Sequence, residues 1–76
     1  MKFKIYHSRD QSGAMYARPE LVSQHRSLRA ALRKLGRNSQ RTLVADTGDE
    51  KYTLCERSRT QAVFMNALGD TIYVSL

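Results

Sequence analysis

Polar and apolar residues alternate at the start of the chain, which is the pattern of a half-buried β-strand. Over residues 2–8, one side of the expected strand carries Phe3, Ile5 and His7. The other side carries Lys2, Lys4, Tyr6 and Ser8. Residues 10–13 are rich in turn formers, so we expect a hairpin into a second strand at residues 14–18, before Pro19 interrupts it.

A helix is expected over residues 27–35. Ser27 is suited to the N-cap, and the apolar residues that follow keep the i, i+3, i+4, i+7 spacing of one helix face. Those residues are Leu28, Ala31, Leu32 and Leu35. Gly36 stands where a left-handed residue ends a helix. Residues 20–26 fit either a strand leading into the helix or two further helical turns, and the pattern leaves both open.

Two further hairpins are expected in the second half of the chain. Residues 42–46 and 51–56 are rich in β-formers around a turn at 47–50, and residues 62–67 and 71–76 flank a second turn. The fold class is therefore α+β: a small antiparallel β-sheet of four to five strands, built from hairpins, with one α-helix packed on one face. With 76 residues, the chain is expected to form a single compact domain over residues 1–76.

Charge is distributed unevenly along the chain, which carries a net charge of +6. Residues 1–41 hold ten Lys and Arg against two acidic residues, whereas residues 42–76 hold three against five. Such asymmetry favours a polyanionic partner, either nucleic acid or an acidic protein surface, although a solubilising surface is the simpler alternative. No apolar run approaches the ~20 residues that span a bilayer. We therefore expect a cytoplasmic protein with no membrane partner.

Basic residues recur three to four positions apart through the expected helix, on the side away from the leucines. This candidate binding set contains Arg26, Arg29, Arg33 and Arg37, together with Lys34. Guanidinium groups suit phosphates or carboxylates, because both accept paired hydrogen bonds from them. A solvated helix face, partly neutralised by acids from the strands, is the structural alternative.

Tyr6 and Tyr73 lie on the strand sides opposite the apolar residues, so both are expected on the exposed face of the sheet. Near Lys4, such rings could stack on bases or anchor a protein interface. Cross-strand packing is the more common role of tyrosines in such positions.

Catalytic and metal chemistry find little support in the sequence. His7, His25 and Cys55 are the soft metal ligands, one on each of three separate elements, and they stand in no nucleophile or metal motif. Cys55 is expected to be a small buried hydrophobe, and His7 a residue at the edge of the core. We therefore expect neither an enzyme nor a bound cofactor or metal.

These observations favour a small, non-catalytic, basic binding protein that docks on nucleic acid or on a surface of nucleic-acid-handling machinery. The small size, single helix and successive hairpins resemble those of phage-encoded inhibitors of host defence, the anti-CRISPR proteins among them. That resemblance implies an inhibitor, but a chain of net charge +6 is no acidic DNA mimic. The alternative is an assembly subunit, such as a homodimer, that self-associates through sheet edges or the helix.

Overall fold

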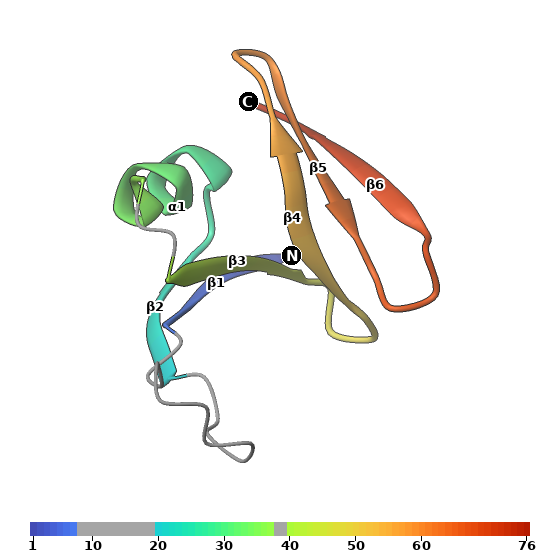
Figure 1. The fold of residues 1–76 in the computed structure, drawn as a ribbon, viewed down its shortest axis with the longest axis horizontal. Helices are drawn as coiled ribbons and strands as arrows, with labels where there is room; N and C mark the ends of the chain where they lie inside the picture. The colour runs from blue at the N-terminus through green and yellow to red at the C-terminus, as the bar shows by residue number, and fades with distance from the viewer. Residues whose placement is uncertain (8–19, 38–39) are drawn as a thin grey trace.

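One α-helix and an antiparallel sheet make up the fold in a computed structural model, which describes residues 1–7, 20–37 and 40–76 (Figure 1). The strands are β1 (Lys2–His7), β2 (Glu20–His25), β3 (Arg41–Asp46), β4 (Lys51–Arg57), β5 (Gln61–Met65) and β6 (Thr71–Ser75), and the helix is α1 (Leu28–Leu35). Their order in the sheet is β2-β1-β3-β4-β5-β6. The expected α+β class is confirmed, but the described residues form six strands, not four to five.

The additional strand comes from residues 20–25, which the sequence left open between strand and helix. They form β2, which pairs with β1 in antiparallel register with a bulge near Ile5 and Tyr6. The hairpin partner expected at residues 14–18 lies outside the described residues. Because β1 is antiparallel to both β2 and β3, those two strands run parallel to each other, and α1 makes the connection between them.

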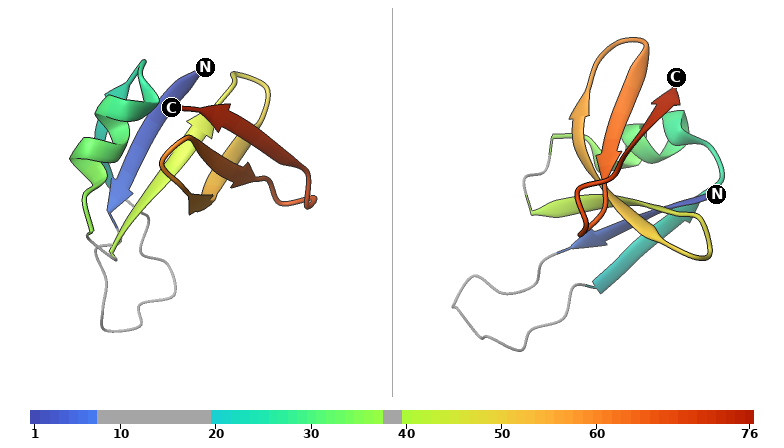
Figure 2. Two further views of the ribbon diagram at one scale, coloured as in Figure 1. Left: turned by 90° about the horizontal axis from the view of Figure 1, so that it is seen from above. Right: turned by 90° about the vertical axis from the view of Figure 1, so that its right-hand side faces the viewer.

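The sheet curls around its core. Phe3 on β1 and Phe64 on β5 are separated by β3 and β4, three strand spacings that would amount to about 14 Å in a flat sheet. Their ring centroids are nevertheless only 6.1 Å apart. Figures 1 and 2 show the cause, since β4, β5 and β6 turn steeply away from β1 and β3.

The concave side of this curl holds the core. The buried side chains form one cluster: Phe3, Ile5, Leu28, Ala31, Leu43, Ala45, Ala62 and Phe64. The helix α1 packs on the same side, against β1, β2 and β3 (Figure 2). Half-buried apolar residues of α1, β4 and β6 extend the cluster. We refer to the opposite side of the sheet as the convex face.

The ends of α1 follow the sequence prediction. The Ser27 hydroxyl accepts a hydrogen bond from the backbone N–H of Ala30 at 3.4 Å, and so caps the first turn. At the other end, the N–H of Gly36 donates to the carbonyl of Leu32 at 3.1 Å, with Gly36 at φ +60°. Glycine adopts this backbone conformation at little cost, so the helix ends there.

Both C-terminal hairpins are confirmed, but the prediction that Cys55 is buried is wrong. The register between β4 and β5 shifts between Leu54 and Glu56, and Cys55 lies in this irregularity with an exposed side chain. The inward–outward alternation of a strand breaks at a bulge. The burial of Cys55 therefore cannot be inferred from its neighbour Leu54, which faces inward.

Candidate functional site

The outer side of α1 is basic because its inner side is fully committed to the core. Leu28 and Ala31 are buried, and Leu32 and Leu35 are half-buried against the same cluster. The cationic residues of the helix are exposed on its other side: Arg29, Arg33 and Lys34.

Two of the expected helical arginines lie outside the helix. Arg26 stands between β2 and the N-cap, and Arg37 follows the terminating Gly36, so the four arginines do not form a single helical row. Both are exposed beside the two ends of α1. We call the five residues Arg26, Arg29, Arg33, Lys34 and Arg37 the basic face.

No carboxylate of the described residues forms an ion pair with a side chain of the basic face. Of the acids in the second half of the chain, most lie at the β3–β4 and β5–β6 turns, and Glu56 lies near the end of β4. The described residues therefore fit a solvated helix face, but they do not show its neutralisation by acids from the strands. Among the described residues, the positive charge of the basic face is therefore not neutralised by an ion pair.

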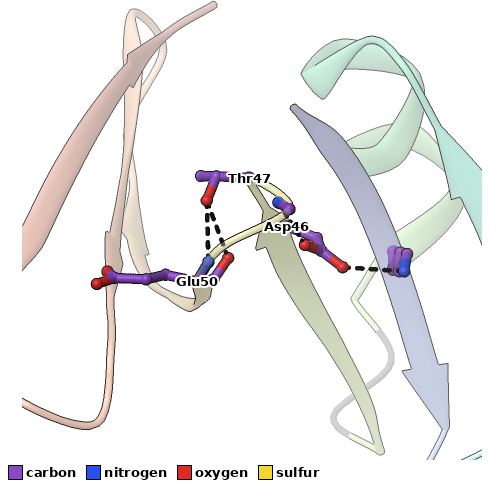
Figure 3. Close-up of polar contacts among 5 residues, drawn as sticks. Asp46, Thr47 and Glu50 are labelled. Carbon is purple, nitrogen blue, oxygen red and sulfur yellow. Dashed lines mark hydrogen bonds and ion pairs between the residues drawn. The ribbon is translucent and has the colours of Figure 1, made fainter.

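Local turn chemistry accounts for Asp46 and Thr47 at the β3–β4 turn (Figure 3). Asp46 accepts a hydrogen bond from the N–H of Gly48 at 2.9 Å, and Thr47 accepts one from the N–H of Glu50 at 3.1 Å. The Glu50 side chain extends to the other side, toward the second hairpin (Figure 3). Such side-chain contacts to the backbone are the usual reason for Asp and Thr in turns.

A polar network then ties the two C-terminal turns together. The Glu50 carboxylate accepts hydrogen bonds from the Tyr52 hydroxyl at 2.5 Å and from the Asn66 amide at 3.1 Å. These two donors hold the pKa of Glu50 below its usual value. The Asn66 carbonyl oxygen accepts from the backbone N–H groups of Leu68 and Asp70. The network therefore links the β3–β4 turn to the β5–β6 turn.

Lys4, one of the candidate binding residues, already has a partner. Its ammonium lies 2.9 Å from the Asp46 carboxylate, and the two side chains are only 22% and 15% exposed. The hydrogen bond to Asp46 raises the pKa of Lys4, and the same contact, followed by the Gly48 N–H, lowers the pKa of Asp46. This pair fastens β1 to the end of β3 and leaves Lys4 little charge to offer a ligand.

The two candidate tyrosines share the convex face but do not meet. Tyr6 is on β1 and Tyr73 on β6, four strands along the sheet. Tyr73 is 67% exposed and borders a hollow beside Arg57 and Val63. Tyr6 is half-buried and borders a separate hollow with Val44, Lys51 and Thr53. The two rings therefore do not form one stacking platform, and neither adjoins the basic face.

Sequence reasoning missed one residue of the basic region, His25. It lies at the end of β2 and borders, with Ala30, Arg33 and Lys34, an open hollow against α1. His25 lies next to α1 because residues 20–25 form a strand beside the helix. The sequence pattern had left strand and helix open for these residues. His7, the other histidine, is half-buried on β1. Within the described ranges, no three His, Cys, Asp or Glu side chains are close enough to hold a metal ion.

Comparisons of the chain with protein-family models, with curated proteins and with solved structures found no match. Among the described residues, no helix has the length and apolar character needed to cross a membrane.

Proposed function

We propose that this chain is a non-catalytic binding protein that docks on nucleic acid through the basic face. One observation carries the proposal: five exposed cations lie on and beside a single helix, and no carboxylate of the described residues pairs with them. Their rigid support is α1, whose opposite side is packed into the core.

Crowded cations of this kind are unfavourable without a partner. Arg29 and Arg33 stand at i and i+4 on α1, where a like-charge pair costs roughly 0.2 to 0.5 kcal/mol. A row of phosphates offsets this repulsion, and each arginine can donate paired hydrogen bonds to a phosphate. Nucleic acid also releases condensed counterions when cations bind it, which favours association most at low salt.

Fluorescence anisotropy with labelled single- and double-stranded DNA and RNA, each at two salt concentrations, tests the proposal. We expect the affinity to fall steeply with salt, by a log–log slope of about −0.9 per phosphate contacted on duplex DNA or about −0.7 on a single strand. A slope near zero, or no binding at low salt, would contradict direct contact with nucleic acid.

A pair of charge-matched variants then locates the interface. The double variant Arg29→Glu with Arg33→Glu should lose binding. The control, Arg57→Glu with Arg59→Glu, changes the net charge by the same amount at the β4–β5 turn, where both arginines are exposed, and should retain most of it. Equal losses would mean that net charge, not the basic face, drives association. Circular dichroism confirms that both variants are folded.

If the chain binds no oligonucleotide at low salt, its target is an acidic protein surface of nucleic-acid machinery, as expected of an inhibitor of host defence. To test this outcome, each of the two double variants is immobilised and used to capture acidic partners. Capture by the control but not by Arg29→Glu with Arg33→Glu would assign the basic face to protein recognition.

Self-association is a second candidate, and β6 favours it. This strand lies at an edge of the described sheet, and its five residues, Thr71–Ser75, include no charge and no proline to block pairing with another strand. Sedimentation velocity over a range of concentrations tests this candidate. A dimer that is lost in Tyr73→Pro, which removes a backbone N–H that points away from β5, but kept in Arg29→Glu with Arg33→Glu would establish the edge as the contact.

A further inference from the structure

A hollow in the basic face brings three nitrogen-bearing side chains to one place. It has a volume of about 310 Å³, lies open to solvent, and is bordered by His25, Ala30, Arg33 and Lys34. None of the bordering residues is acidic. Arg33 and Lys34 follow Ala30 by three and four positions, so they lie one turn beyond it on the helix surface. The methyl side chain of Ala30 leaves the space between them unfilled.

We propose that this hollow seats a phosphate group of the bound nucleic acid. The inference rests on the proposed function and specifies where one phosphate is held. Arg33 can donate two hydrogen bonds in a fork, Lys34 supplies a compact positive charge, and the imidazole of His25 adds a third donor. Three donors that converge from two elements suit the several oxygens of a phosphate better than the planar pair of a carboxylate.

His25 is held in place for this role. Its Nε2 lies 3.0 Å from the hydroxyl oxygen of Ser23, two residues earlier on the same strand. The opposite position on β1 is Phe3, which is buried and uncharged, and α1 contributes Arg33 and Lys34. With Nε2 engaged by Ser23, Nδ1 is the ring nitrogen left for a ligand.

The carbonyl end of α1 would by itself weaken an anion site. The C-terminal end of a helix carries a partial negative charge, and Lys34 lies in the last turn. Arg41 offsets this charge, because its Nη1 donates a hydrogen bond to the backbone carbonyl of Lys34 at 3.2 Å. The Lys34 side chain therefore lies beside a helix end whose negative charge is already offset by Arg41.

Two variants with matched controls test the hollow. Ala30→Leu fills it without changing any charge, and Ala67→Leu makes the same change in the exposed β5–β6 loop. His25→Leu removes the imidazole donor from the hollow, and His7→Leu removes the imidazole on β1. The readout is anisotropy of a labelled single-stranded oligonucleotide, with and without a 5′-phosphate.

We expect Ala30→Leu to weaken binding roughly tenfold, the equivalent of one charge-assisted hydrogen bond, while Ala67→Leu binds as the wild type does. His7→Leu should also bind as the wild type does, and His25→Leu should bind several-fold more weakly, because it lacks one donor to the phosphate. A preference for the 5′-phosphorylated strand would assign the hollow to a terminal phosphate. Equal affinities would assign it to a backbone phosphate.

The inference is overturned if Ala30→Leu binds like the wild type, or if His25→Leu does. Either result would leave the proposed function intact as long as the wild type binds the oligonucleotide. If the wild type does not bind, an NMR titration with inorganic phosphate decides separately on the hollow. Shifts of the His25 ring signals, with those of His7 unchanged, would support a phosphate seat, and unchanged His25 signals would exclude it.

Discussion

Replacing Phe3 and Phe64 with leucine, singly and together, tests whether the sheet curls as described. Each ring is buried, and the 6.1 Å between their centroids is within the range of favourable aromatic pairs. We expect each single variant to cost about 1 to 2 kcal/mol of unfolding free energy. The double variant should cost about 0.5 to 1.5 kcal/mol less than the sum of the two single variants. The reason is that the second substitution removes an aromatic contact that the first has already broken.

The assay is urea unfolding at 25 °C, monitored by circular dichroism. A chain of this size is expected to have roughly 4 to 11 kcal/mol of stability, so the double variant should still fold. Met65→Leu, on the convex face beside Phe64, is the control and should show no coupling to Phe3→Leu. If the two phenylalanine variants are additive within about 0.3 kcal/mol, the rings do not touch and the curl is refuted.

Three further predictions concern particular residues. Gly36→Ala should destabilise the protein by about 1 to 2 kcal/mol in thermal unfolding, because φ +60° is strained for alanine although no atom lies within 4 Å of the added methyl; an unchanged melting temperature would contradict it. Cys55 should react with a thiol reagent in the native state as fast as in urea, whereas protection until unfolding would show that it is buried after all. The contact with Lys4 lowers the pKa of Asp46, so its stabilising effect is present above the unfolded pKa and is lost as pH falls through the folded one. The difference in urea midpoint between wild type and Asp46→Asn should therefore shrink below about pH 4, and a constant difference down to pH 2 would contradict this reasoning.

Local patterns predicted the elements whose partners are close in sequence. Ser27 and Gly36 bracket α1 as expected, and the two C-terminal hairpins form around the expected turns. Residues 20–25 remained open because Leu21, His25 and Leu28 also fit a helical spacing. Pairing with β1, a tertiary contact, decides in favour of the strand. Propensity alone does not resolve such competition.

The candidate site was predicted in part for the same reason. Exposed Arg29, Arg33 and Lys34 follow directly from the apolar stripe of α1. The separation of Tyr6 from Tyr73, and the engagement of Lys4 by Asp46, depend on strand order, which alternation along one strand does not contain. The position of His25 beside Arg33 likewise required knowing that β2 lies next to α1.

The parallel arrangement of β2 and β3 around β1 also has a consequence for the order of folding. The hairpins β3–β4, β4–β5 and β5–β6 join neighbours in sequence, and such hairpins form within microseconds. In the N-terminal half, β1 must pair with β2 on one side and with β3 on the other. The chain has to pass through α1 across β1 before β3 can pair with it. The slow step of folding should therefore be the enclosure of β1, which is complete only when the basic helix has crossed and β3 has paired with β1.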